Sequence, residues 1–322
     1  MNFEAIKSAA TPHLCALVAE AFPKGRKTGR EWRTGSVYGE AGGSTAISLT
    51  DGRWIDHATG QSGDLISLWA ERFGLGVKDA GLDLMARLGL SEEAPLPVPD
   101  AKAAERVKAE LDFDERKRIN LARSIWADAQ QIEGTIAEVY LRSRGITLNL
   151  PSSLRYLPGY KHGPSGLSMG CMIGAVTVEG DKRIRAVHRT WLRRDGTDKA
   201  NVNPAKMMLG PASGGAVRLA KAADELILGE GVETVLSAMQ VSGLPGWACL
   251  STGGLMAVKL PPLPIARNAL IAADNDEPGL KAADECARRL ASEGRSVRIA
   301  KPPEPGTDFN DILRQGGLSN VA

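Results

Sequence analysis

The spacing of apolar residues changes several times along the chain, and each change predicts a different kind of segment. Residues 1–22 carry apolar positions at helical spacing and predict one amphipathic helix. Over residues 23–60, short alternating runs such as "STAISLTDGRWIDHATG" predict a small antiparallel β unit. "GDLISLWAERFGL" then predicts a helix that begins near Gly63-Asp64. The Pro-rich stretch "SEEAPLPVPDAK" (91–102) predicts a linker.

The second part of the chain passes from helical to β spacing and then alternates between the two. Residues 102–145 are charged with a helical period, and residues 170–220 are β-like with a turn at Gly180-Asp181. From Glu225 onward the pattern runs strand, helix, strand, helix, which is typical of a parallel sheet with helical crossovers. We therefore expect an α/β fold class, as a multidomain α+β chain whose C-terminal part contains a parallel sheet.

Composition narrows the class of protein without identifying it. The 322 residues are 43% hydrophobic and carry a formal net charge of only +2, so partners must be argued from local charge. None of the four cysteines forms a C-x-x-C pair, which favours reduced thiols over a zinc cluster or a disulfide framework. No apolar run approaches the ~20 residues of a membrane span. These features predict a cytoplasmic protein with no membrane partner.

Acidic residues follow the apolar strands of the last hundred residues. Glu230 follows the strand at 225–229, Asp274 and Asp276 follow "ALIAA", and Asp308 lies in "GTDFNDIL". Ligand sites of open α/β sheets lie at the carboxyl ends of the strands, where these acids would meet. If strand geometry continues through them, Asp274 and Asp276 point to the same face. Converging carboxylates repel one another unless a cation intervenes, and Mg²⁺ prefers such oxygens.

Local structure offers an alternative explanation for the same residues. Asp-Asn-Asp before "EPG" is equally typical of a turn that caps a helix. Glu233 is a candidate ligand, but a solvated acid in the first turn of a helix explains this residue at least as well.

The combined pattern resembles the Toprim fold of bacterial-type primases, topoisomerases and some nucleases. "LILGEGVETVLSA" is similar to its glutamate motif and "ALIAADNDEPGLKAA" to its paired-aspartate motif, over roughly residues 221–315. "EGVETVLSA", "DNDEPGLKAA" and "DFNDIL" are especially similar to primases of phages and mobile elements. The resemblance implies that Glu230, Asp274 and Asp276 are catalytic and bind metal, with Asp308 as a further metal-associated acid.

A basic stretch precedes this region. "KRIRAVHRTWLRRDGTDKANVNPAK" holds eight Lys or Arg residues, which are suited to gripping phosphates. With its neighbours over about 136–220 it resembles the basic subdomain that precedes Toprim in primases, where an Arg closes the "HRT" strand and a Lys lies in a later "K-x-x-x-G" segment. By that resemblance the nucleotide- or template-binding candidates are Arg189 and Lys206, followed by Lys199, Arg193 and Arg194. The alternative is an ordinary solvated sheet, and His188 is more often structural than catalytic.

The N-terminal unit resembles the zinc-finger unit of primases but lacks its ligands. Residues 23–75 contain no cysteine and only His57, whereas a structural zinc site needs about four N or S ligands. We expect no zinc, and packing of Trp32, Trp54, Ile55 and Leu65 instead. A basic run can bind single-stranded DNA through Lys24, Arg26, Lys27, Arg30, Trp32 and Arg33. A charged loop with Trp32 in the core is an equally good explanation.

The resemblance implies a DNA primase that makes short RNA primers on single-stranded DNA by metal-dependent nucleotidyl transfer. The expected cofactor is Mg²⁺ or Mn²⁺. The expected partners are single-stranded DNA template and nucleoside triphosphates, and a separate replicative helicase is a candidate, because no P-loop motif is present. A Toprim nuclease and a catalytically silent replication accessory protein remain alternatives. The expected parts are 1–95 (zinc-finger-like unit), 96–135 (helical linker), 136–220 (basic primase subdomain) and 221–322 (Toprim domain).

Overall fold

The computed structural model describes residues 2–90 and 101–315, and the chain divides into two compact units, residues 1–117 and 118–322. Most of the predicted Pro-rich linker at 91–102 lies outside the described residues. Helix α5 (Ala101–Asp128) crosses the boundary between the units.

The N-terminal unit packs helices against a small antiparallel sheet in the strand order β1-β2-β3-β4-β5. Its strands are β1 (Arg26–Thr28), β2 (Glu31–Thr34), β3 (Thr45–Ser48), β4 (Trp54–Asp56) and β5 (Ser62–Gly63). Its helices are α1 (Phe3–Ala10), the 3₁₀ turn η1 (Thr11–His13), α2 (Leu14–Ala21), α3 (Leu65–Phe73) and α4 (Val77–Arg87). The predicted β unit is therefore present, together with the helix that follows it.

Two local expectations for this unit need correction. The single helix predicted over residues 1–22 is two helices separated by η1, because Pro12 has no amide hydrogen to continue a helix and fits best at its start. Trp54 and Leu65 lie in the core and Trp32 packs against it, whereas Ile55 is only half-buried.

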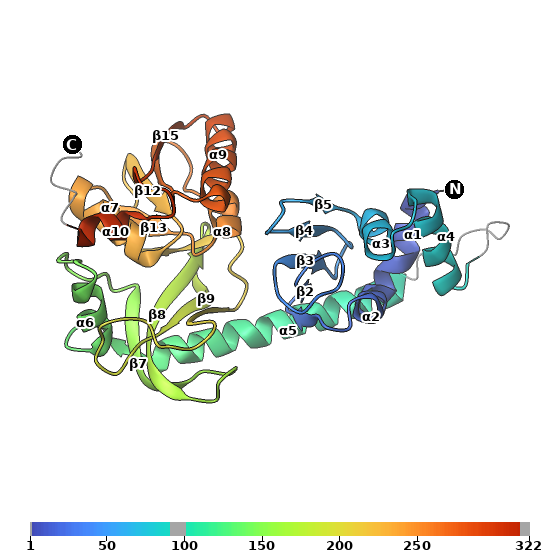
Figure 1. Cartoon of the computed structure of the whole chain (residues 1–322), viewed down its shortest axis with the longest axis horizontal. Helices are drawn as coiled ribbons and strands as arrows, with labels where there is room; N and C mark the ends of the chain where they lie inside the picture. Colours follow the sequence, from blue (N-terminus) through green and yellow to red (C-terminus); the bar gives the residue numbers. More distant parts are fainter. Residues whose placement is uncertain (1, 91–100, 316–322) are drawn as a thin grey trace. The chain divides into compact units, whose positions relative to one another are not determined.

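The C-terminal unit is built on a sheet whose antiparallel part is continuous with a parallel part (Figure 1). The antiparallel strands are β6 (Gln130–Gln131), β7 (Leu154–Lys161), β8 (Ser168–Val178), β9 (Asp181–Trp191), β10 (Lys206–Leu209) and β11 (Gly215–Arg218). The parallel strands, in spatial order, are β13 (Gly246–Ala248), β12 (Glu225–Gly229), β14 (Asn268–Ala272) and β15 (Ser296–Ala300). Strand β11 joins the two parts by pairing with β8 on one side and β13 on the other.

Helices cover both faces of the parallel strands, which explains their continuous apolar character. On β12, Ile227 packs into the cluster that contains α7, whereas Leu226 and Leu228 pack into the cluster that contains α8 and α9. The helices of this part are α7 (Val232–Ser242), α8 (Thr252–Ala257), α9 (Glu277–Ser292) and α10 (Phe309–Arg314). The predicted α/β arrangement with a parallel sheet is confirmed.

The antiparallel part is covered by the second half of α5 and by α6 (Ile136–Ser143). Ala122, Ile125 and Ala129 pack with Ile173 and Trp191 in one buried cluster, while α6 packs into the cluster that also contains α7. This packing attaches the antiparallel β region to the parallel sheet, so that side chains from both can line one site.

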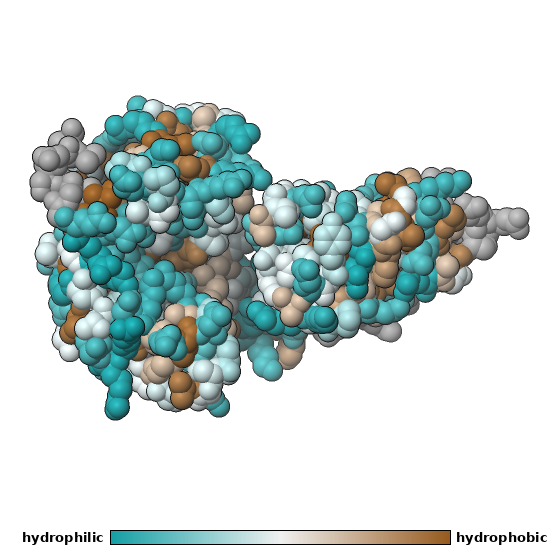
Figure 2. Space-filling view, viewed as in Figure 1, coloured by the Kyte–Doolittle hydropathy of each residue, from teal (hydrophilic) through white to brown (hydrophobic). Residues whose placement is uncertain are grey.

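The surface of each unit is mostly hydrophilic in the view of Figure 2, with hydrophobic residues scattered among polar ones. Scattered exposed apolar side chains are normal for folded proteins and indicate no particular interaction. Within the described ranges, no helix is both long and apolar enough to cross a bilayer.

Candidate functional site

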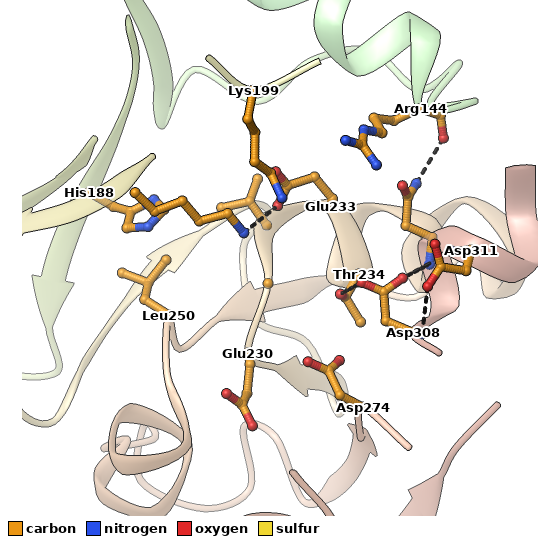
Figure 3. A pocket seen from close by; sticks show the side chains of 14 residues that line it. Arg144, His188, Lys199, Glu230, Glu233, Thr234, Leu250, Asp274, Asp308 and Asp311 are labelled. Carbon is orange, nitrogen blue, oxygen red and sulfur yellow. Dashed lines mark hydrogen bonds and ion pairs between the residues drawn. The ribbon is translucent and has the colours of Figure 1, made fainter. Parts of the chain in front are cut away.

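A pocket of about 180 Å³ opens in the C-terminal unit where β12 and β14 end (Figure 3). Side chains from the parallel sheet, from α7 and α10 and from the basic β region all reach it. Its lining residues are Arg144, His188, Lys199, Lys206, Glu230, Gly231, Val232, Glu233, Thr234, Leu250, Asp274, Asp308, Asn310 and Asp311.

Glu230 and Asp274 reach the pocket from the ends of neighbouring parallel strands. Gly229 of β12 pairs with Ala272 of β14, so the residues that follow each strand come close together. The amide of Leu250 donates to the carbonyl oxygen of Glu230 at 2.8 Å, which fixes the backbone there. Within the part of the chain that the structure describes, Glu230 Oε1 and Asp274 Oδ1 are buried without a hydrogen-bond partner.

Burial and repulsion by neighbouring carboxylates disfavour the ionised form of both carboxyls. Burial, then the nearby Asp274 and Asp276 carboxylates, raise the pKa of Glu230 to about 7. Burial, then Asp308 and Asp276, raise the pKa of Asp274 to about 6. Two half-buried carboxyls that share a pocket, each with a buried oxygen that lacks a partner, form an unstable arrangement for a protein alone, and a cation would relieve it.

Asp276 and Asp308 are also close, but both carboxylates cap helices. Strand β14 ends at Ala272, so the condition under which Asp274 and Asp276 would point to the same face is not met. Asp276 does not line the pocket; its Oδ1 accepts the amide hydrogen of Gly279 at 2.7 Å at the start of α9. Any larger residue at 279 would bring a Cβ within 2.7 Å of the Asp274 carbonyl oxygen, so glycine lets α9 begin here.

Asp308 lines the pocket while capping α10. Its Oδ1 accepts the amides of Asn310 at 2.7 Å and Asp311 at 3.0 Å, and its Oδ2 accepts the Thr234 hydroxyl at 3.1 Å. The neighbouring Asn310 is buried and donates to the carbonyl oxygen of Arg144 at 2.8 Å and to Ser237 Oγ at 3.0 Å. These bonds attach α10 to α7 and to the end of α6, and so fix this side of the pocket.

The acidic group fits a cation that takes few protein ligands. No cluster of three or more His, Cys, Asp and Glu side chains is arranged to hold a metal ion in residues 2–90 and 101–315. Among the described residues that line the pocket, only Glu230 and Asp274 have a buried carboxyl oxygen without a partner. Mg²⁺ is commonly bound by one or two carboxylates together with substrate phosphates, and this pair matches that donor set.

Positively charged side chains approach the same pocket from the antiparallel region. Lys206 begins β10, Lys199 follows β9 in the loop, and Arg144 ends α6 (Figure 3). Lys206 Nζ lies 3.6 Å from Glu233 Oε2, and this carboxylate raises the pKa of Lys206. Burial lowers the pKa of Lys199. One wall of the pocket is thus cationic and the other carries the carboxyl pair.

The resemblance favoured Arg189 as a binding residue, but the structure places its neighbour His188 in the pocket lining. Alternate side chains of β9 point to opposite faces, and His188 lines the pocket while Arg189 does not. Arg189 instead donates to the Met208 carbonyl oxygen at 3.0 Å and lies over the ring of Trp191. Burial, with Lys206 nearby, lowers the pKa of His188 to about 4, so it is neutral at pH 7. Arg193 and Arg194 are exposed and lie outside the pocket lining.

The predicted basic run of the N-terminal unit is partly engaged in ion pairs. Arg30 pairs with Asp112 and Glu115, and Lys27 pairs with Asp114 at 3.2 Å. All three acids lie on α5, so this helix supplies the partners of Lys27 and Arg30.

Trp32 is half-buried, and its indole NH donates to the Phe22 carbonyl oxygen at 3.1 Å, so this ring packs against the core. Arg33 pairs with Glu31 at 2.7 Å. Lys24 and Arg26 are exposed. DNA binding by this run stays a prediction.

Several residues that line the pocket were not predicted from the sequence, and Arg144 shows most clearly which signal was available. It follows α6 within "YLRSRGI", four residues after the buried Tyr140, and its guanidinium lies over the Tyr140 ring. That i, i+4 spacing on one helical face was the available signal. The contacts of Thr234 and Asn310 depend on the docking of α10, which no local pattern reveals.

Comparison with known families agrees with this geometry. Residues 225–319 match the Toprim domain family, so the chain contains a Toprim domain. Residues 116–219 match a family described only as a domain of unknown function (DUF7146). No curated protein matches the chain.

Solved structures of primases are similar to the chain at low sequence identity. The zinc-binding and RNA polymerase domains of the Aquifex aeolicus primase match with 16% identity and a TM-score of 0.38, over 95% of this chain and 80% of that one. A primase domain from Pseudomonas aeruginosa matches with 16% identity and a TM-score of 0.41, over 62% and 74%. The RNA polymerase domain of the Mycobacterium tuberculosis primase matches with 12% identity and a TM-score of 0.41, over 63% and 81%.

Proposed function

We propose that the chain is a primase-type nucleotidyltransferase that joins nucleotides from nucleoside triphosphates into short RNA primers on single-stranded DNA. The observation that carries this proposal is the pocket itself. In a Toprim domain, the half-buried carboxyls of Glu230 and Asp274, each with one buried oxygen that has no partner, face a wall formed by Lys199, Lys206 and Arg144. A substrate that brings both phosphates and a divalent cation would satisfy both walls.

The carboxyl pair would hold Mg²⁺ or Mn²⁺ as carboxylates. Such an ion, when bound, polarises phosphate oxygens and favours ionisation of an attacking hydroxyl. Because the protein offers two suitable carboxyls, the phosphates of the substrate would complete the ligand set. Asp308 and Asp276 add negative charge nearby while they cap α10 and α9. We propose these two as supporting acids of the site.

The cationic wall would bind the triphosphate. Lys199 and Lys206 act as compact charges, and Arg144 offers several planar donors suited to phosphate oxygens. Arg189, Arg193 and Arg194 lie outside the pocket lining, and we propose that they contact the template strand. We further propose that residues 136–220 form the basic subdomain and residues 221–322 the Toprim domain.

Primer synthesis on single-stranded DNA with labelled ribonucleoside triphosphates tests the proposal. We expect product only when Mg²⁺ or Mn²⁺ is present, and a loss of about 100-fold or more in Asp274→Asn. Asp284→Asn is the matched control, since this exposed aspartate lies on α9 away from the pocket.

Three results would contradict the proposal. Asp274→Asn activity within a few-fold of wild type would remove the carboxyl pair from catalysis. Cleavage of DNA without nucleotides, and no synthesis, would indicate a nuclease. Salt-sensitive binding of single strands with no product and no effect of divalent ions would indicate an accessory protein.

A further inference from the structure

Glu233 is a buried acid whose two oxygens have different partners. It lies in the first turn of α7 and is only 6% exposed, so its interpretation as a solvated helix acid was wrong. Its Oε1 accepts the hydroxyl hydrogen of Tyr140 at 2.6 Å, and its Oε2 lies 3.6 Å from Lys206 Nζ. Tyr140 is fully buried, so its hydroxyl has no access to water as an alternative partner.

The charges around Glu233 explain why it stays ionised so far from solvent. Burial alone would raise the pKa of Glu233, but Lys206 and Lys199 outweigh burial and hold that pKa well below its usual value. Lys199 and Lys206 also lie close enough to repel each other. The negative charge of Glu233 therefore compensates both ammonium groups and permits both to occupy one wall of the pocket.

We propose that Glu233 is a positioning residue that holds Lys206, and through it Lys199, toward the phosphates of the bound nucleotide. Tyr140 fixes the other oxygen of this carboxylate, so its orientation does not depend on the substrate. The inference rests on the proposed function for the identity of the ligand. The arrangement of Tyr140, Glu233 and Lys206 is independent of that function.

Glu233 differs from the proposed cation pair in how its oxygens are used. Glu230 and Asp274 each keep a buried oxygen without a partner, whereas both oxygens of Glu233 face donors. Glu233 therefore acts through Lys206, and its loss should weaken nucleotide binding more than it slows the chemical step. Replacing Glu230 with glutamine should slow the chemical step more than it weakens nucleotide binding.

Two measurements on Glu233→Gln test the proposal, with Glu225→Gln as the matched control. Glu225 is a glutamate at the start of β12, outside the pocket lining and near the exposed Arg298. The first measurement is the rate of reductive methylation of Lys206 at pH 8, relative to the exposed Lys221, by peptide mass spectrometry. The second is the KM and kcat of primer synthesis for the nucleoside triphosphate.

We expect Glu233→Gln to raise Lys206 labelling and the nucleotide KM about tenfold each, with kcat within a few-fold of wild type. Tyr140→Phe removes only one hydroxyl and should shift both quantities in the same direction by a smaller factor. It also serves if Glu233→Gln does not fold. The control should change neither quantity.

Unchanged Lys206 labelling in folded Glu233→Gln and Tyr140→Phe would overturn the positioning role, whatever the protein does with nucleotides. Raised labelling with an unchanged KM would overturn the link to the phosphates. If the wild-type protein makes no primer, the proposed function fails, and the labelling still decides whether Glu233 positions Lys206.

Discussion

At the scale of single residues, the pocket contains two kinds of carboxyl group, the buried Glu233 and the half-buried pair Glu230 and Asp274. Glu233 is surrounded by donors, and its pKa is held low by Lys206 and Lys199 despite burial. Glu230 and Asp274 are half-buried, and desolvation together with neighbouring carboxylates outweighs the nearby Lys206, so their pKa values rise to about 7 and about 6. A carboxylate whose desolvation is not fully compensated destabilises the folded chain, so the second kind is costly unless a ligand is bound.

This cost predicts how stability depends on pH when no divalent ion is present. The pKa of Glu230 is 4.5 in an exposed reference and about 7 in the folded chain, so the folded state binds more protons between these values. The contribution of Glu230 to the free energy of unfolding therefore falls as pH rises from about 4.5 to 7. Glu230→Gln should be more stable than wild type at pH 8 by on the order of 1–3 kcal/mol, and near parity at pH 4.5.

Urea denaturation in EDTA at a series of pH values measures this difference. Comparing the two proteins cancels titrating groups that do not interact with Glu230, including His188, whose lowered pKa favours the folded state toward higher pH. Glu225→Gln should show a small difference that does not grow between pH 5 and 8. A Glu230→Gln difference that is constant across pH would contradict the raised pKa of this carboxyl.

Individual residues also show where the sequence was sufficient and where it was not. Glu230 and Asp274 were predictable because each follows an apolar strand of a parallel sheet, and such strands end at one edge. Arg189 was named by the family resemblance, but neighbouring side chains of β9 point to opposite faces, and His188 lines the pocket instead. Arg144 was missed because its place in the pocket depends on how α6 packs against the sheet.

At the scale of elements, the six-residue turn from Asp274 to Gly279 both lines the pocket and begins a helix. Asp274 ends in the pocket, and Asp276 begins α9 as its N-cap. The sequence allowed both a metal pair and a cap, and spacing alone could not assign one task to each residue. The amide of Asn275 donates to Thr307 at 3.0 Å, which holds the segment before α10 against this turn.

Capping predicts a difference between two substitutions of Asp276. Asp276→Ala and Asp276→Ser remove the same charge, but only serine can accept the Gly279 amide. We expect the alanine variant to unfold with a free energy about 1 kcal/mol lower than the serine variant. Urea denaturation at pH 7 measures it, and equal stability of the two variants would show that Asp276 does not cap α9 in solution.

At the scale of the whole molecule, every lining residue of the pocket falls between Arg144 and Asp311, inside the C-terminal unit. The alternation of strands and helices was readable in the sequence because buried parallel strands are continuously apolar. The joining of that sheet to the antiparallel strands through β11 was not, because it depends on pairing between distant segments.

The location of the pocket predicts that a fragment of residues 118–322 folds and keeps the site. The fragment retains Ala122, Ile125 and Ala129, which pack α5 onto the sheet. We expect one cooperative thermal transition, raised by Mn²⁺ as much as the matching transition of the full chain, since a ligand of the folded state stabilises it by mass action. Glu230→Gln with Asp274→Asn in the fragment should abolish the shift. Two results would show that the site needs residues of the N-terminal unit. One is a fragment that unfolds without cooperativity. The other is a fragment whose transition temperature is unchanged by Mn²⁺ although that of the full chain rises.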